Sequence, residues 1–356
     1  MTPAFSGELP LIIDWLQTVI WGLLAAVLLL FVMIIIAKAL GQAALWYEEK
    51  RRGVFMPAID DIIAGADTGD IDGIRPRRPG DRLIIERLLL ETMTPLSGVL
   101  VDHLGLLADR AAITACRIRE LDAPDLATRA QAAEILGRLG SRASVPRLIT
   151  ALKQESGIFK TVAARSLGRI RDISAIPALV EGLENAGPGA ARTFAQAIVS
   201  FRYDAVSLIL DKLSGMNEHK GRYISVLGEI RALEAVPAAK DLLINGKDQA
   251  TRKEAARALG RIADPDTAKA LCETMKDTDP GVRAMAAWAL GKTADAATCE
   301  NVASFMRDED PWVRARIAQA LAQLGEPGRK KLQELKDHPA EEIRTLAREM
   351  LESAAA

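Results

Sequence analysis

The stretch "ARALGRIADP" (residues 256–265) decides the fold, because the chain nearly repeats it about every 31 residues. Its apolar residues recur three and four positions apart, the spacing of an amphipathic helix, and Asp-Pro ends it. Related stretches are "AEILGRLGSR" (133–142), "ARSLGRIRDI" (164–173), "ISVLGEIRAL" (224–233), "AWALGKTADA" (287–296) and "AQALAQLGEP" (318–327). A period of this length predicts an array of short helical units.

A common register supports the repeat. The apolar markers before the small residue are Leu136, Leu167, Val199, Leu227, Leu259, Leu290, Leu321 and Leu351. The small residues that follow are Gly137, Gly168, Ser200, Gly228, Gly260, Gly291 and Ala322. A base precedes each marker by seven residues: Arg129, Lys160, Arg192, Lys220, Arg252, Arg283, Arg314 and Arg344. An acid stands four residues before several of these bases: Asp125, Asp248, Asp279 and Asp310.

Each unit is predicted to contain two helices. The first, such as "TAKALCETMK" (267–276), ends in the turn "DTDPG", and the second is "VRAMAAWALGKT" (282–293). Asp279 and Pro280 suit the N-cap and first turn of that second helix. A single hairpin buries too little apolar surface to offset the entropy of ordering it, whereas stacked copies bury both of its sides. The predicted fold class is therefore all-α, with a solenoid of about eight two-helix repeats over residues 123–356.

The unit resembles a known repeat family. "DPGVRAMAAWALGKT" (279–293) and "DPWVRARIAQALAQL" (310–324) are similar to HEAT repeats, particularly the short repeats of the phycobilisome-lyase-like HEAT proteins. The copies that hold Arg192 and Lys220 depart from this pattern. The resemblance implies a scaffold or a peptide-binding surface. The bilin lyases resemble the array as well, which leaves an accessory lyase or chaperone as the alternative function.

The first fifty residues have a different composition from the repeats. Residues 15–37, "WLQTVIWGLLAAVLLLFVMIIIA", contain no formal charge over 23 positions. At 1.5 Å per residue they span about 35 Å, enough to cross a hydrocarbon core of about 30 Å. A secretory signal peptide is the rival interpretation, but it needs a basic N-terminal region and a shorter apolar core. The sequence favours a single uncleaved N-terminal transmembrane helix.

Flanking charges predict the orientation of this helix. Glu8 and Asp14 precede it, whereas Lys38, Lys50, Arg51 and Arg52 follow it. The positive-inside rule then places the N-terminus outside and everything after residue 50 in the cytoplasm. The expected location is the inner membrane of a bacterium, as the resemblance to bacterial HEAT proteins with an anchor suggests. The predicted organisation is an N-terminal tail with the anchor (1–52), a flexible juxtamembrane linker (53–80), a helical N-terminal cap (81–122) and the solenoid (123–356).

Several kinds of chemistry are disfavoured by the composition. The three cysteines lack CxxC spacing, and none of the three histidines is followed by the glutamate that HEAT-type deoxyhypusine hydroxylases use to bind iron. We find no P-loop, GxSxG or other catalytic motif, and we expect no enzyme activity, no cofactor and no metal site. From residue 123 onward the chain has 34 basic and 31 acidic residues, too small an excess for a nucleic-acid-binding array.

With these functions disfavoured, the remaining hypothesis is a protein-binding surface. In HEAT arrays the second helices line the concave face, so positions five and nine after each repeat base are expected to point away from the core. The candidate protein-binding residues at these positions are Arg165, Arg169, Arg257, Arg261, Trp288 and Lys292, with Trp288 as the apolar anchor. The alternative is a solvated charged face in which Trp288 lies half-buried between helices.

The predicted function is a membrane-anchored, cytoplasm-facing adaptor that binds a protein client in an inner-membrane assembly. Bacterial HEAT proteins with an anchor suggest a polysaccharide synthase as one such client. Within the anchor, Gly22 and Ala26 lie four residues apart and form a weak small-xxx-small face, predicted to contact another membrane helix.

Overall fold

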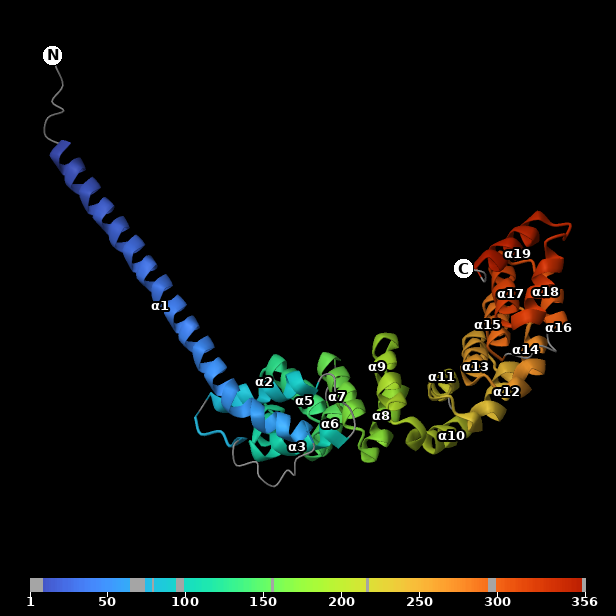
Figure 1. Cartoon of the computed structure of the whole chain (residues 1–356), viewed down its shortest axis with the longest axis horizontal. Coiled ribbons are helices and arrows are strands. Elements are labelled where there is room, and N and C mark those ends of the chain that lie inside the picture. Colours follow the sequence, from blue (N-terminus) through green and yellow to red (C-terminus); the bar gives the residue numbers. More distant parts are fainter. Residues whose placement is uncertain are drawn as a thin grey trace, which may run out of the picture. The chain divides into compact units, whose positions relative to one another are not determined.

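The computed structural model of the chain describes residues 9–64, 74–78, 80–93, 99–154, 157–215, 218–293 and 299–353. Every regular element in these residues is a helix, which confirms the predicted fold class (Figure 1). The described chain divides into two compact units, Met1–Ile113 and Thr114–Ala356.

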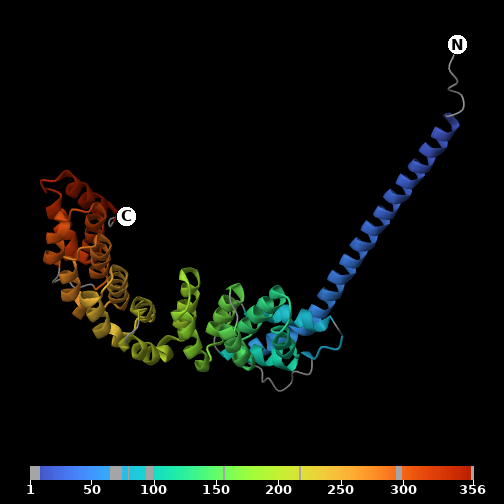
Figure 2. The ribbon, with the colours of Figure 1, turned by 180° about the vertical axis from the view of Figure 1, so that it is seen from behind.

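The first unit contains α1 (Leu9–Ile63), α2 (Asp81–Met93) and α3 (Val99–Arg110). α1 runs without interruption for 55 residues. It is long and apolar enough to cross a membrane, with a mean hydropathy of 3.1 in its most apolar window, and none of that window is buried by the rest of the chain. The apolar side chains of the predicted span therefore face outward along the isolated part of the helix seen in Figures 1 and 2.

The predicted flexible linker (53–80) includes residues that are helical in the structure. α1 continues past residue 52 to Ile63, and its last turns pack against α2 and α3. Phe55, Ile59 and Ile62 are buried there, at the four- and three-residue spacing of one helix face. Residues 53–63 are thus part of the same helix as the anchor rather than a flexible connection, because this apolar face has a partner in the cap. Most of the remaining linker, residues 65–73, lies outside the described residues.

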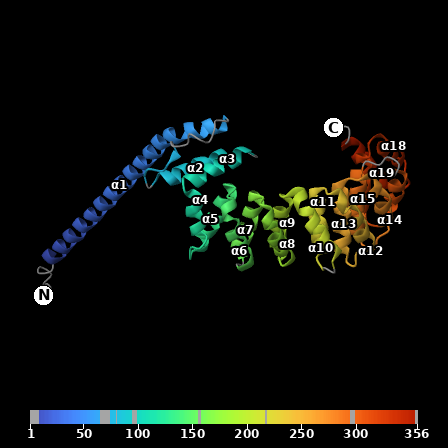
Figure 3. The ribbon, with the colours of Figure 1, turned by 90° about the horizontal axis from the view of Figure 1, so that it is seen from below.

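The second unit is the solenoid, built from eight pairs of helices. The first helices of the pairs are α4 (Ile113–Glu120), α6 (Val145–Gln154), α8 (Ile176–Glu184), α10 (Val206–Ser214), α12 (Val236–Asn245), α14 (Ala268–Thr274), α16 (Cys299–Ser304) and α18 (Gly325–Leu335). The second helices are α5 (Leu126–Arg138), α7 (Gly157–Ile170), α9 (Pro188–Val199), α11 (Lys220–Ile230), α13 (Gln249–Ile262), α15 (Pro280–Thr293), α17 (Pro311–Gln323) and α19 (Glu341–Ser353). Successive pairs stack in chain order, as Figure 3 shows from below.

The boundary between cap and solenoid also differs from the prediction. α4 was expected to belong to the cap (81–122), but the compact second unit begins at Thr114. Leu121, directly after α4, is buried in the continuous core that runs through the solenoid. α4 is therefore the first helix of the first repeat, although its sequence lacks the repeat motif.

Second helices approach one another closely at the small residue of each repeat. A Cβ built on Gly228 of α11 would lie 2.6 Å from the Cα of Ala258 on α13. A Cβ on Gly291 of α15 would lie 2.8 Å from the Cα of Ala320 on α17. Side chains do not fit at these distances, which explains why the repeat keeps glycine inside a helix despite its cost of about 1 kcal/mol in helix propensity.

The acid and the base of the repeat stabilise its turns. Asp279 accepts a hydrogen bond from the amide of Val282 at 2.9 Å and caps α15, as predicted. Arg283 donates to the Asp277 carbonyl at 2.9 Å and forms a bidentate ion pair with Asp308 of the following turn, at 2.8 and 2.9 Å. The side chains of Arg283 and Asp308 are each only 8% exposed.

Arg252 makes the corresponding ion pair with Asp277 one repeat earlier, at 2.7 and 3.0 Å. Burial raises the pKa of the Asp277 and Asp308 carboxyls, but the hydrogen bonds from Arg252 and Arg283, the backbone amides of Asp279 and Asp310 and the nearby arginine charges together outweigh it and hold both pKa values below their ordinary range. Arg252 and Arg283 therefore each tie one turn to the next, and these two ion pairs form an arginine ladder.

A groove on the inner face of the solenoid

The inner side of the solenoid's curve is lined by second helices. Figure 1 shows α9, α11, α13 and α15 along this side, with α8, α10, α12 and α14 outside them. A groove of about 730 Å³ opens here between α9, α11 and α13. The predicted concave surface of second helices and the groove therefore coincide.

The groove opens where the repeat register changes. At the other junctions the glycine faces the residue directly before the next marker, as Gly228 faces Ala258. Gly168 of α7 instead faces Ala197, so the marker of α9 is Ile198 rather than the predicted Val199. Val199, not Ser200, then occupies the glycine position of α9.

A branched side chain at the position of close approach separates two helices. Val199 lines the groove, and α9 and α11 pack less closely than α7 and α9 or α11 and α13, the pairs of second helices on either side of them. The Ser200 hydroxyl points the other way and donates to the carbonyls of Gly168 and Ala197, at 2.5 and 2.6 Å. The groove thus lies where the α9 copy departs from the register of the other repeats.

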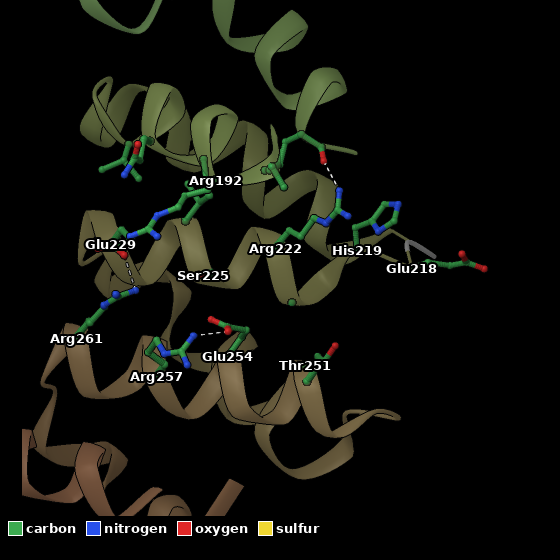
Figure 4. A pocket seen from close by; sticks show the side chains of 18 of the residues that line it. Arg192, Glu218, His219, Arg222, Ser225, Glu229, Thr251, Glu254, Arg257 and Arg261 are labelled. Carbon is green, nitrogen blue, oxygen red and sulfur yellow. Dashed lines mark hydrogen bonds and ion pairs between the residues drawn. The ribbon is translucent and has the colours of Figure 1, made fainter. Parts of the chain in front are cut away.

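The groove is lined by both apolar and charged side chains, and Figure 4 labels most of the charged ones. Leu183, Ala191, Ala195, Val199 and Val226 supply the apolar lining. The basic lining residues are Arg192, His219, Arg222, Arg257 and Arg261, and the acidic ones are Glu218, Glu229, Asp248 and Glu254.

Two ion pairs lie in the exposed part of the groove, one between α11 and α13 and one within α13. Arg261 of α13 pairs with Glu229 of α11 at 2.7 Å, and the two side chains are 31% and 46% exposed. Arg257 pairs with Glu254 one turn earlier on its own helix. Arg192 reaches the same wall from α9 and is exposed, and within the described residues it forms no ion pair.

The other end of the groove is more rigid. Arg222 donates from Nη1 to the carbonyls of Leu183 and Glu184, at 2.6 and 3.2 Å, which ties α11 to the end of α8. Asp248 caps α13 by accepting from the Thr251 amide and hydroxyl, both at 2.7 Å, and these bonds lower the pKa of its carboxyl. The charged side chains that are exposed enough to bind a ligand are therefore those of Arg192, Glu229, Arg257 and Arg261.

The predicted binding residues separate into two sets. Arg257 and Arg261 line the groove, whereas Trp288 and Lys292 do not. Trp288 is half-buried, and its ring carbon Cζ3 would lie 2.6 Å from a Cβ on Gly260, so the indole covers the backbone of α13. Arg165 and Arg169 are exposed on α7, where Arg169 pairs with Glu134 of α5. The structure gives Trp288 a packing contact, and its role as a binding anchor stays a prediction.

Sequence reasoning missed Arg192, Arg222, Glu229 and Glu254 as groove residues. The available signal was the interval of 28 residues between Val199 and Leu227, the shortest in the array. Metal chemistry has no support in the described part of the chain, where no group of three His, Cys, Asp or Glu side chains is placed to hold an ion.

Comparison with known proteins bears on the fold. The chain is similar to the CpcE–CpcF complex of phycocyanin lyase from Nostoc sp. PCC7120, at 21% identity over 68% of this chain and 94% of that one, with a TM-score of 0.34. Human deoxyhypusine hydroxylase shares 18% identity over 78% of this chain and all of that one, with a TM-score of 0.30. Kap121p shares 12% identity over 87% of this chain and 39% of its own, with a TM-score of 0.55.

Comparison with curated proteins finds no significant sequence match. A family model of HEAT repeats, in contrast, matches residues 117–198, 206–284 and 268–352, which is more than half of the chain. The glycine contacts, the capping aspartates and the arginine ladder lie within these matched residues. The chain therefore belongs to the HEAT-repeat proteins.

Proposed function

We propose that the chain is a membrane-tethered adaptor that holds a segment of a protein client on the inner face of its solenoid, centred on the groove between α9, α11 and α13. The observation that carries this proposal is the groove itself, which opens beside α9, where a valine stands at the position of the glycine of close approach. HEAT-repeat proteins commonly bind protein partners, and no reaction is needed to explain this arrangement.

The lining of the groove suits a peptide with mixed chemistry. Alanine and valine side chains offer an apolar base, while Arg192, Arg257 and Arg261 can bind carboxylates of the client. The two ion pairs in the wall are about one-third exposed, and such pairs contribute only about 0–1 kcal/mol to stability. A client carboxylate can therefore replace Glu229 or Glu254 as the partner of its arginine at little cost.

The double variant Arg257→Ala/Arg261→Ala is expected to weaken recovery of the client at least thirtyfold, because truncating interface hot spots costs about 2 kcal/mol or more. The measurement is the amount of each protein that co-purifies with the tagged full chain in mild detergent. Arg329→Ala/Lys330→Ala is the matched control, because both side chains are exposed on α18, away from the groove.

The melting temperature of each variant separates binding from folding. Equal recovery of a stoichiometric partner by the groove variant and the control would reject the groove as the binding site. A bound tetrapyrrole in place of a protein partner would favour the accessory-lyase alternative.

The tether in this proposal is α1, with the N-terminus outside and the solenoid in the cytoplasm at a bacterial inner membrane. Its support is the unburied apolar window and the basic residues that follow it. A Cβ on Gly22 would meet nothing within 4 Å, so the proposed Gly22–Ala26 face is open to another membrane helix. A polysaccharide synthase remains the client suggested by resemblance.

Protease added to intact spheroplasts is expected to leave the solenoid undigested, because the charges around α1 place it on the cytoplasmic side. Permeabilised spheroplasts provide the control in which digestion proceeds. Digestion from outside would contradict the orientation, and a mature N-terminus near residue 40 would contradict the anchor.

A further inference from the structure

The loop before α2 lies at the membrane-facing end of the first unit, given that α1 is the tether. Asp81, the first residue of α2, accepts hydrogen bonds from the Tyr47 hydroxyl and the Arg51 guanidinium of α1. The start of α2 is therefore beside Tyr47 and Arg51, the part of the cap nearest to the predicted span. Residues 74–78 lead into this start.

A buried carboxylate holds the loop in place. Asp81 is fully buried and accepts two hydrogen bonds from Arg51 and one from Tyr47, all at 2.9 Å. It also accepts from the backbone amides of Arg77 and Arg78, both at 3.0 Å. Burial raises the pKa of the Asp81 carboxyl, but these bonds outweigh it and leave the pKa below its ordinary value. Asp81 thus ties the loop backbone to α1.

The loop presents basic side chains. Ile74 is buried and anchors it from inside, while Arg75, Arg77 and Arg78 are exposed. The Arg78 guanidinium lies 5.9 Å from the centre of the Tyr47 ring. Residues 74–78 contain three arginines and no acid.

The distance to the membrane suits contact with lipid headgroups. Tyr47 lies ten residues beyond Ala37, the last residue of the predicted span, which is about 15 Å along the helix. The headgroup layer occupies roughly 5–7 Å of this distance, and the surface potential extends about 8 Å further at physiological salt. A tilted helix brings the loop closer still.

We propose that Arg75, Arg77 and Arg78 form a binding surface for the phosphates of anionic phospholipids in the leaflet through which α1 enters the cytoplasm. This proposal rests on the proposed tether. Because Asp81 holds the loop and Arg51 together, lipid binding would fix the rotation and tilt of the cap relative to the membrane.

The experiment titrates short-chain phosphatidylglycerol into the full chain in a non-ionic detergent and follows the melting temperature of the protein. Phosphatidylglycerol is expected to raise it, whereas phosphatidylcholine is not. The variant Arg75→Gln/Arg77→Gln/Arg78→Gln is expected to bind phosphatidylglycerol about tenfold or more weakly, since each base near an anionic surface contributes roughly fivefold in affinity. The corresponding triple lysine variant keeps the charge and is expected to retain binding.

Two controls define the source of the effect. Arg142→Gln/Arg329→Gln/Lys330→Gln removes three exposed charges of the solenoid and is expected to change nothing. Glycerol phosphate tests a soluble phosphate compound, and equal stabilisation by it would overturn the assignment to lipid. Equal responses of the wild-type chain and the triple glutamine variant would also overturn the proposal.

The experiments distinguish failure of the lipid-binding proposal from failure of the proposed adaptor function. Loss of client recovery in the triple glutamine variant, without a change in the phosphatidylglycerol response, would assign the loop to a protein partner instead. Failure of the chain to remain in membranes after carbonate extraction would reject the tether, whereas a lipid-insensitive but membrane-embedded chain would reject only the loop surface.

Discussion

Gly260→Leu is expected to lower the free energy of unfolding of the solenoid by about 3 kcal/mol, the upper end of typical overpacking costs. A Cβ at this position would lie 2.6 Å from Cζ3 of Trp288 and 2.8 Å from the Cα of Ala289. The tryptophan ring can move by rotation, but the backbone of α15 cannot move without separating α13 from α15. Denaturant unfolding of the full chain in mild detergent, followed by circular dichroism, measures the change.

Two alanine substitutions test whether this effect comes from the contact between α13 and α15. Gly260→Ala is expected to destabilise the protein despite the better helix propensity of alanine, because the first added carbon already overlaps Ala289. Gly189→Ala in α9 is the matched control, since a Cβ there would meet nothing within 4 Å. It is expected to be neutral or stabilising by up to about 1 kcal/mol. Equal effects at the two positions would contradict the role assigned to Gly260.

The repeat was predictable from the sequence because its signals are local. The Asp279 cap and the helix that begins at Pro280 depend on residues within one turn of each other, and the sequence analysis placed both correctly. The glycines were recognisable because they recur at one position in an otherwise apolar stripe. The repeat period was therefore sufficient to predict an all-α solenoid from the sequence.

The groove and the cap depend on contacts between different helices, which the repeat period does not reveal. Val199 lines the groove from α9, on the side that faces α11. Its position was missed because the α9 copy departs from the repeat pattern and its register was assigned one residue too late. Asp81 meets Arg51 thirty residues away in sequence, so the pair gives no local signal. Phe55, Ile59 and Ile62 did carry the spacing of a buried helix face, and the Gly- and Asp-rich stretch that follows led us to begin the linker too early.

Trp288 illustrates the limit for binding residues. A tryptophan at a position that other repeats fill with Glu134, Ser225 or Gln319 is compatible with an interface anchor and with a packing role. In the structure its ring covers Gly260, whose missing side chain provides the space. Sequence pattern alone does not separate these roles, because both place an aromatic residue on the same face of the helix.

Asp308→Ala is expected to lower the free energy of unfolding by about 3 kcal/mol, because it leaves the buried guanidinium of Arg283 without its bidentate partner. Asp308 also accepts a hydrogen bond from the Asp310 amide at 2.9 Å, so the variant loosens the turn before α17 as well. Glu309→Ala is the matched control: Glu309 lies 3.6 Å from the same arginine, but its side chain is 90% exposed. An exposed pair of this kind contributes little, and the control is expected to change stability by less than about 1 kcal/mol.

The dependence of this difference on pH tests its electrostatic origin. Burial raises the pKa of Asp308, but the hydrogen bonds from Arg283 and the Asp310 amide and the charges of Arg283 and Arg314 together hold it, in the folded chain, below that of an unfolded aspartate, which is about 3.9. The stabilisation is therefore fully present above the unfolded pKa and is lost as the pH falls through the lower, folded pKa. Wild type and Asp308→Ala are expected to differ in full at pH 7 and to converge below about pH 4. A difference that persists unchanged in acid would mean that Asp308 acts through packing and turn geometry, and would contradict the ion-pair ladder as the source of stability between repeats.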